Sequence, residues 1–205
     1  MSELNTAPEK KRGRKLSFDR DVALVKATLV FWEHGYETTS VSDLIAAMNI
    51  STPSLYTAFG DKERLFLEVV ERYADTEMRI LNKTLREAAT AQTAVRAVLD
   101  NAVIAYTRDD FPKGCMLVTA GISGSDSSQN VRSILAEYRN ARREQMKRYL
   151  QHAVKFGQLS SDPCELAHFY SAVLEGLTIQ ARAGGSRQLL ANIARRAMCA
   201  WPTRD

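Results

Sequence analysis

The 205-residue sequence lacks the features that define several classes of protein. No stretch approaches the roughly 18 consecutive apolar residues that a membrane-spanning helix needs. The first 17 residues are polar and basic, without the apolar segment of a secretory signal. We therefore expect a cytoplasmic protein without a membrane partner.

Cysteine and histidine are scarce, with three of each. Cys115, Cys164 and Cys199 lie far apart, so neither a disulfide framework nor a zinc finger is expected. Cys164 and His168 are one helical turn apart, which suits a reactive pair or half a metal site, but two ligands do not make a site and ordinary packing is the simpler interpretation. We expect no metal and no cofactor.

Catalytic patterns are also missing. The sequence shows no paired carboxylates, no serine, histidine and aspartate arrangement with supporting motifs, and no glycine-rich phosphate loop. We therefore predict that the chain is not an enzyme, and a helical enzyme remains the weakest of the alternatives.

What is present is typical of a globular chain, with 45% hydrophobic residues, 25% charged residues and a formal net charge of +4. Much of the positive charge lies in residues 10–15, which contain five cations around Gly13. Such an arm binds anions, including nucleic acid, but a solubilising tail has the same composition. The arm alone leaves both interpretations open.

Three helices are predicted after the arm, the first of about four turns and the next two shorter. Apolar residues recur at helical spacing from Asp19 until Gly35, a natural helix stop. Ser40 and Asp43 have the spacing of a capping box at the start of a second helix. A third begins near Ser51 or Thr52, with a proline in its first turn.

The second and third helices have the form of a helix-turn-helix, in which the later helix enters the major groove of DNA. Leu55 and Phe59 lie one turn apart and face inward, so Thr52, Ser54 and Thr57 face outward. Their hydroxyls can meet base edges or phosphates. An ordinary helical hairpin is the alternative.

The runs Gly35-Tyr-Glu-Thr-Thr-Ser-Val-Ser-Asp-Leu-Ile-Ala-Ala-Met48 and Ser54-Leu-Tyr-Thr-Ala-Phe-Gly-Asp-Lys-Glu-Arg-Leu-Phe66 closely resemble the DNA-binding domain of the TetR/AcrR family of repressors. The resemblance covers about residues 14–66, and residues 112–118 and 169–184 look like the C-terminal domain of one TetR subgroup. It implies a homodimeric, sequence-specific DNA-binding transcriptional regulator. A repressor of this kind leaves its palindromic double-stranded operator when an unknown small-molecule effector binds.

The resemblance also implies which residues contact DNA. The third helix would read the operator, Tyr56 and Lys62 would contact phosphate, and the arm would add phosphate or minor-groove contacts. Ala58 stands where many relatives carry a larger residue. The expected DNA contacts are Arg12, Arg14, Lys15, Thr39, Ser51, Thr52, Pro53, Ser54, Tyr56, Thr57 and Lys62.

The rest of the chain keeps a helical pattern, beginning with a long helix from Lys62 to Arg86. We predict an all-α fold of about nine helices. Its expected parts are a basic arm (1–15), a three-helix DNA-binding domain (16–62) and an effector-binding and dimerisation domain (63–205). Arg132 to Lys155 contains seven cations, Arg142 among them, which we interpret as a solvated helix face in preference to a second nucleic-acid surface.

Two further sets of residues are expected in the C-terminal part, and for both the alternative is ordinary core packing. The dimer interface, which the resemblance favours on the last two long helices, would use Phe169, Val173, Leu177, Leu190 and Ile193. The effector pocket would use Met78, Tyr106, Phe111, Cys115, Met116 and Tyr170.

Two other functions stay open at this point. Cys115 follows Lys113-Gly114, and a nearby cation favours the thiolate, so a thiol-based redox or electrophile-sensing regulator is the main alternative. An inert buried cysteine is the simpler interpretation of the same residue. The other function is a structural DNA-binding protein without an effector, which would show no operator preference.

Overall fold

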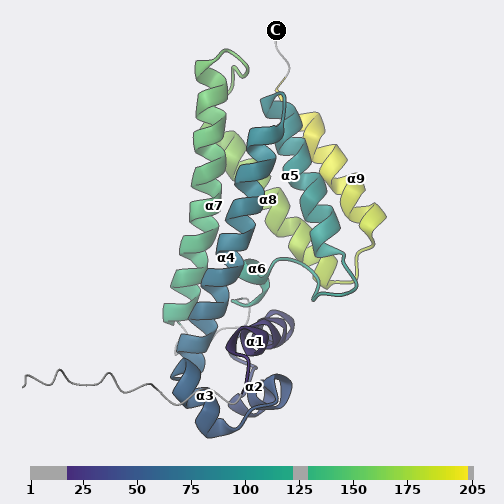
Figure 1. Cartoon of the computed structure of the whole chain (residues 1–205). Coiled ribbons are helices and arrows are strands. Elements are labelled where there is room, and N and C mark those ends of the chain that lie inside the picture. Colours follow the sequence, from purple (N-terminus) through teal and green to yellow (C-terminus); the bar gives the residue numbers. More distant parts are fainter. Residues whose placement is uncertain (1–17, 122–128, 203–205) are drawn as a thin grey trace, which may run out of the picture.

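The computed structural model describes residues 18–121 and 129–202, and in these ranges the chain forms nine α-helices, one short 3-10 helix and no strand (Figure 1). The prediction of an all-α fold is confirmed. The expected DNA contacts Arg12, Arg14 and Lys15 lie outside the described residues. The helices are α1 (Arg20–His34), α2 (Val41–Met48), α3 (Thr52–Phe59), α4 (Lys62–Glu87), α5 (Ala91–Tyr106), α6 (Met116–Thr119), α7 (Gln129–Lys155), α8 (Pro163–Arg182) and α9 (Arg187–Ala197), with the 3-10 helix at Met198–Ala200.

The first three helices begin and end at the signals in the sequence. Asp19 caps α1, accepting hydrogen bonds from the backbone of Asp21 and Val22, and the helix ends at Gly35, whose φ of 82° suits glycine. Ser40 and Asp43 form the complete capping box of α2. Ser51 caps α3, and Pro53 lies in its first turn. Local chemistry thus fixes the geometry of the helix-turn-helix.

The long helices α4 and α7 run side by side, and α4 extends from the α1–α3 unit into the rest of the molecule (Figure 1). One continuous core joins the two parts. Phe31 of α1 meets Phe66 of α4 edge to face at a centroid distance of 5.0 Å, and both side chains are fully buried. Burial of each such side chain contributes roughly 1.5–3 kcal/mol. The first turns of α4 are therefore part of the α1–α3 unit as well as of the C-terminal part.

A second link between the two parts runs through the end of α1. The backbone N–H of Tyr36 donates to the carbonyl of Ala120, just after α6, at 3.4 Å. Arg182, in the last turn of α8, donates to the Glu33 carbonyl at 2.7 Å and pairs with the Glu33 carboxylate at 3.3 Å. The end of α1 is thereby held against α6 and α8.

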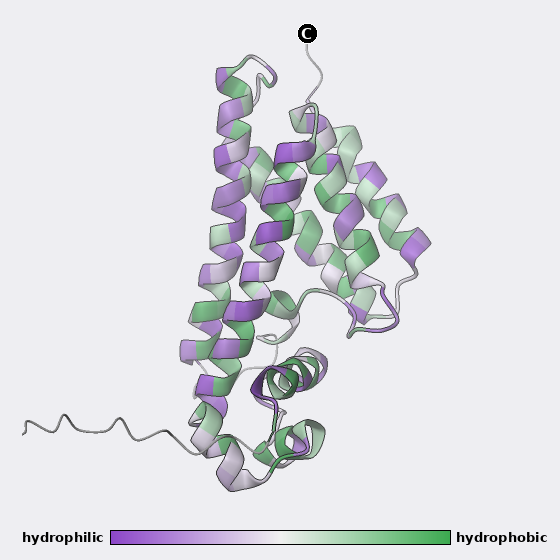
Figure 2. Cartoon of the chain, in the orientation of Figure 1, coloured by the Kyte–Doolittle hydropathy of each residue, from purple (hydrophilic) through white to green (hydrophobic). Residues whose placement is uncertain are grey.

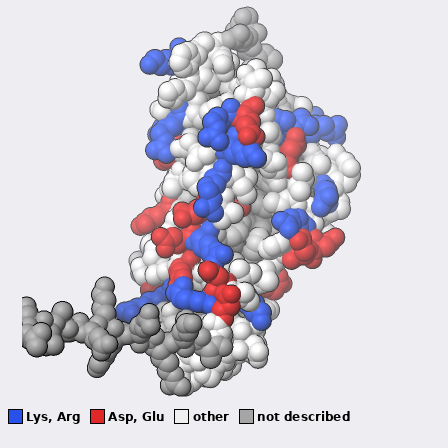
Figure 3. All heavy atoms as spheres, in the orientation of Figure 1, with Lys and Arg blue, Asp and Glu red and all other residues white. Residues whose placement is uncertain are grey.

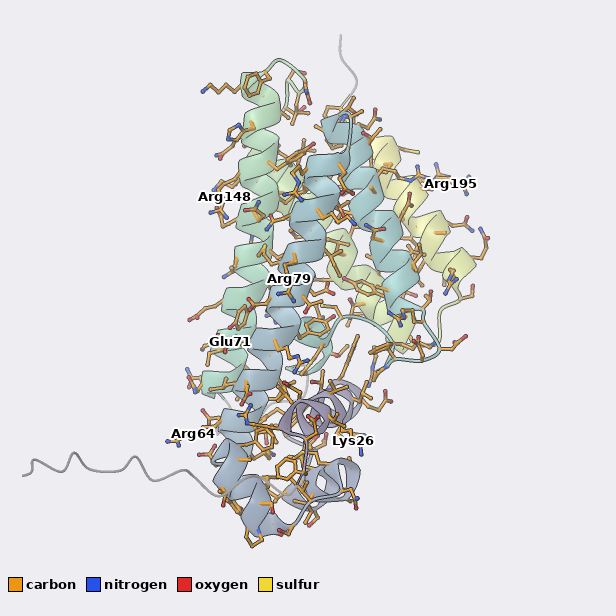
Figure 4. All side chains as sticks on the ribbon, viewed as in Figure 1. Lys26, Arg64, Glu71, Arg79, Arg148 and Arg195 are labelled. Carbon is orange, nitrogen blue, oxygen red and sulfur yellow. The ribbon has the colours of Figure 1, made fainter. Side chains whose placement is uncertain are left out.

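Hydrophilic and hydrophobic residues alternate along the helices (Figure 2), and apolar side chains make up most of the buried core. Lys and Arg are interspersed with Asp and Glu on the face shown in Figure 3. Side chains such as Arg64, Arg148 and Arg195 project away from the helices (Figure 4). Arg142 is an exception to the predicted solvated face of α7, because it turns into the core and is only 8% exposed. Among the described helices, none has the length and apolar character needed to cross a membrane.

Candidate nucleic-acid interface

The candidate recognition surface is the outward side of α3. Leu55 and Phe59 are buried, as the spacing predicts, and they hold the helix against its neighbours. Thr52, Tyr56 and Thr57 are exposed, Tyr56 with half of its surface. Ser51 and Pro53 are also exposed, and Ser54 is half-buried. The helix thus presents a polar edge of hydroxyl groups at the end of the molecule opposite the chain's C-terminus (Figure 1).

Several of these hydroxyls already have partners. The Thr57 hydroxyl donates to the Pro53 carbonyl at 2.8 Å, and the Ser51 and Ser54 hydroxyls lie 2.8 Å apart. For the side-chain hydroxyls of Thr52 and Tyr56, the described part of the chain provides no hydrogen-bond partner. A hydroxyl both donates and accepts, so Thr52 and Tyr56 are the side chains of α3 most ready to meet a base edge or a phosphate.

Thr39 and Lys62 have structural contacts that the sequence did not indicate. Thr39 is 1% exposed, and its hydroxyl donates to the Gly35 carbonyl at 2.6 Å. Its own carbonyl accepts from Lys62 Nζ at 2.8 Å, and that ammonium lies 4.3 Å from the ring centroid of Tyr36. Burial lowers the pKa of Lys62. Lys62 therefore holds the entrance of α2 against the start of α4, and the Thr39 side chain faces inward.

Arg20 is a further positioning residue of this unit. Its guanidinium forms two hydrogen bonds with the Glu68 carboxylate, at 2.5 and 2.7 Å, and two longer ones with the Ala58 carbonyl, at 3.4 and 3.3 Å. It also lies 4.6 Å from the ring centroid of Phe59. The bond to Glu68 raises the pKa of Arg20. Arg20 thus fastens the end of α3 to α1 and α4, through partners too distant in sequence for any local pattern to show.

A cavity of about 370 Å³, here called the junction cavity, lies where the DNA-binding unit meets the C-terminal part. Helices α1, α4 and α5 and the loop after α5 form its walls. A smaller cavity of about 70 Å³ adjoins it, and Glu77, Ile80, Ala105 and Tyr106 line both. Arg142 lines only the smaller one. The junction cavity is lined by Val25, Thr28, Leu29, Trp32, Arg72, Tyr73, Thr76, Glu77, Ile80, Ala105, Tyr106, Arg108, Phe111 and Gly114.

Two of the six expected pocket residues line this space. Tyr106 lines both cavities and Phe111 lines the larger. Cys115, Met116 and Tyr170 are completely buried and line neither, and Met78 packs against the small cluster around Leu81 and Leu85. The sequence analysis did not predict that Glu77 and Arg142 line these cavities, because charged residues on long helices ordinarily face water.

Arg142 is buried and Glu77 is half-buried, and neither forms an ion pair with another described residue. In the described structure no carboxylate lies within 4 Å of Arg142, whose guanidinium has a contact of 3.8 Å with the Cys115 sulfur. Burial raises the pKa of Glu77, while the positive charge of Arg142 opposes that change. Burial also raises the pKa of Tyr106 and Tyr73, so both phenols stay protonated near neutral pH.

The surroundings of Cys115 and Cys164 do not favour a reactive thiolate at either residue. Cys115 is fully buried, with the Tyr73 hydroxyl 3.7 Å from its sulfur. The Cys164 sulfur lies 3.6 Å from His168 Nδ1, but that nitrogen is closer, at 2.8 Å, to the Cys164 carbonyl of the same helix. The described residues contain no group of three or more side chains that could hold a metal ion.

The expected dimer surface is only partly available. Leu177 and Leu190 are completely buried inside the chain, so they belong to its own core. Phe169 is 42% exposed, and Val173 and Ile193 are half-buried. Phe169 and Ile193 border a surface hollow of about 470 Å³ on α8 and α9.

Comparisons with known proteins agree with this geometry. The model "Bacterial regulatory proteins, tetR family" matches residues 23–69, and the model "Tetracyclin repressor-like, C-terminal domain" matches residues 91–198. The chain is 34% identical to the HTH-type transcriptional repressor ComR of Escherichia coli (strain K12), over 95% of this chain and 94% of that protein. It is 32% identical to the HTH-type transcriptional repressor BdcR of the same organism, over 89% of each.

A solved structure also resembles most of the chain. It is a cysteine mutant of the TetR family transcriptional regulator CifR, complexed with 26-base-pair double-strand operator DNA. The likeness has a TM-score of 0.89 and 38% sequence identity, and it covers 93% of this chain and 100% of that one.

Proposed function

The chain belongs to the TetR family of bacterial transcriptional regulators, and from this we propose that it is a repressor which binds a palindromic operator as a homodimer and leaves it when a small molecule binds. The observation that carries the proposal is α3, which buries Leu55 and Phe59 and presents Thr52 and Tyr56 to solvent. The operator complex of CifR supports it. The chain acts by binding in the cytoplasm, not by catalysis.

In this proposal Thr52, Ser54 and Thr57 meet base edges, and Tyr56 meets the phosphate backbone. Lys62 keeps its bond to Thr39 and directs a remaining N–H toward a phosphate, because an ammonium has three donors. The proposed boundaries remain an arm of residues 1–15, a DNA-binding domain of 16–62 and an effector and dimer domain of 63–205. The arm supplies Arg12, Arg14 and Lys15 to phosphates or the minor groove.

A homodimer supplies the second recognition helix that a specific site requires, with half-sites about one helical turn or a multiple of it apart. The exposed part of α8 and α9, with Phe169, Val173 and Ile193, is the surface we propose for it. A buried Cys115 makes the thiol-based alternative less favourable, since reactive thiols are partly exposed.

Selection of bound duplexes from a random DNA library, with purified full-length chain at moderate salt, tests this function. We expect an enriched palindrome with two equal half-sites. The Thr52→Ala variant should enrich a different or relaxed sequence, and the exposed control Lys83→Met should enrich the same one. Salt-sensitive binding without enrichment would replace the proposal with a structural DNA-binding role.

A further inference from the structure

We propose that the junction cavity is the effector site, and that its effector is an uncharged, largely apolar ring compound with one hydroxyl group, which lies between Glu77 and Arg142. This inference rests on the proposed function, because it names the chemistry of the effector and the place where it acts. Its starting observation is a cavity to which α1 of the DNA-binding unit contributes one wall.

The size and lining of the junction cavity suit the body of such a molecule. Its volume of about 370 Å³ falls within the range of small-molecule sites, which begins near 300 Å³. Trp32, Tyr73 and Phe111 provide aromatic walls, with the Trp32 and Phe111 ring centroids 5.8 Å apart. An aromatic or alicyclic ring would bury its apolar surface against these side chains.

Two charged side chains, the half-buried Glu77 and the buried Arg142, define where the polar end of the ligand would lie. Glu77 lines the boundary of the two cavities and Arg142 lines the smaller one, which holds only about 70 Å³. A carboxylate accepts hydrogen bonds and a guanidinium donates them, so a group that donates and accepts satisfies both. A hydroxyl is the smallest such group. It would donate to Glu77 and accept from Arg142.

The same pair argues against charged effectors. A carboxylate ligand would be repelled by Glu77, and an ammonium ligand would be repelled by Arg142, which is 8% exposed and has no carboxylate within 4 Å among the described residues. Arg72 and Arg108 also line the junction cavity, but their guanidiniums are already paired with the carboxylates of Asp21 and Asp110. Burial of an unpaired charge in such a site is costly. An uncharged ligand avoids both penalties.

The position of the cavity connects a bound effector to α3 through α1. Trp32 lies on α1, and the same helix holds the end of α3 through Arg20 and the Ala58 carbonyl. A ligand that fits better when α1 stands farther from α4 would shift that clamp, and with it the recognition helix. The shift in DNA affinity can equal only the ligand's preference between the two arrangements.

Binding of four naphthalene probes to the full chain tests the chemistry. Calorimetry or ligand-observed NMR at neutral pH would compare 2-naphthol, naphthalene, 2-naphthoate and 2-naphthylmethylammonium. We expect 2-naphthol to bind at least about tenfold tighter than the other three, the range that hydrogen bonds to charged groups provide. Glu77→Gln should narrow the gap between 2-naphthol and 2-naphthoate. Equal binding of naphthalene, or no binding of 2-naphthol at millimolar concentration, would overturn the inference.

Variants test the location. Ala105 lines both cavities, so Ala105→Phe should weaken 2-naphthol binding by about tenfold or more, whereas Ile104→Phe, at an exposed neighbour that lines neither, should not. Ile80→Trp is the second variant, since Ile80 also lines both cavities but is 48% exposed, which favours normal folding. Unchanged binding in a folded Ile80→Trp or Ala105→Phe would place the probe elsewhere and contradict the inference.

The two proposals fail separately. An enriched operator together with a chain that binds none of the probes would overturn the effector site and leave the repressor intact. Tight, cavity-dependent binding of 2-naphthol by a chain that selects no operator would contradict the proposed function, and it would leave the ligand chemistry of the cavity standing without its effector role. The inference predicts in addition that 2-naphthol lowers the affinity of the chain for the selected operator, and an unchanged affinity would overturn the role of the cavity as effector site.

Discussion

Replacement of Lys62 by methionine separates the structural and DNA-binding roles of this residue. Methionine keeps most of the side chain's length and apolar stem but removes the ammonium. The variant therefore loses the 2.8 Å bond to the Thr39 carbonyl and the contact with the Tyr36 ring, and it leaves a carbonyl of a buried residue without that donor.

The expected loss of stability follows from these contacts. Hydrogen bonds to charged groups contribute about 1.5–3 kcal/mol. A cation over an aromatic ring at a partly exposed site adds about 0.5–1 kcal/mol. Because Lys62 is only half-buried, we take the lower part of this range and expect a loss of about 2 kcal/mol. For a chain of this size that corresponds to a fall in Tm of about 4–8 °C.

Thermal unfolding and salt-dependent DNA binding measure the two roles together. Lys83→Met is the control, since Lys83 is exposed on the same helix, and surface changes of this kind usually stay within about 0.5 kcal/mol. If Lys62 also meets one phosphate, its loss lowers the salt slope of binding by about 0.9. A Lys62→Met chain as stable as the Lys83→Met chain would refute the role of Lys62 as a clamp between α2 and α4.

Three other predictions concern the DNA surface, the cavity and the dimer. In competition assays, Thr52→Ala should change the order of preference among duplexes, while Tyr56→Phe should lower the affinity for all duplexes similarly. If Thr52→Ala lowers the affinity for all duplexes by the same factor, Thr52 does not contact bases. Burial raises the pKa of Glu77 above its ordinary 4.5, so the folded chain binds this proton more tightly than the unfolded chain. The folded chain therefore loses stability as the pH rises from about 4.5 through the raised pKa. Urea unfolding should accordingly show Glu77→Gln gaining stability relative to the parent between pH 4.5 and neutrality, and a constant difference would contradict the shift. In sedimentation experiments, Phe169→Glu should yield monomers. The control Phe156→Glu, at a more exposed phenylalanine just after α7, should remain dimeric. A dimeric Phe169→Glu variant would show that the interface lies elsewhere.

Local signals made the fold predictable. Caps and stops depend on residues within one turn of each other, so Ser40 with Asp43, Pro53 and Gly35 could be interpreted from the sequence alone. Helix α6 is the weakest case, because it spans only four residues, Met116–Thr119. The backbone there turns to meet α1, a tertiary contact that no local pattern contains.

The sites were less predictable because distant residues decide which way a side chain faces. Arg142 lies in a cation-rich helix and looks solvated, yet α7 turns it toward Cys115. Leu177 and Leu190 have the spacing of an interface, but the same spacing serves an internal core, and the chain buries both. Apolar periodicity shows which face of a helix is buried, but it does not show which element of the same chain or of a partner packs against that face.

The affinity of the full chain for the selected palindrome, compared with the same duplex carrying one scrambled half-site, tests the central claim most directly. At fixed moderate salt, a homodimer that reads both halves should bind the scrambled duplex at least about a hundredfold more weakly, since each mismatched base pair costs about 1–3 kcal/mol. Equal affinity for the two duplexes would contradict a dimeric, sequence-specific repressor.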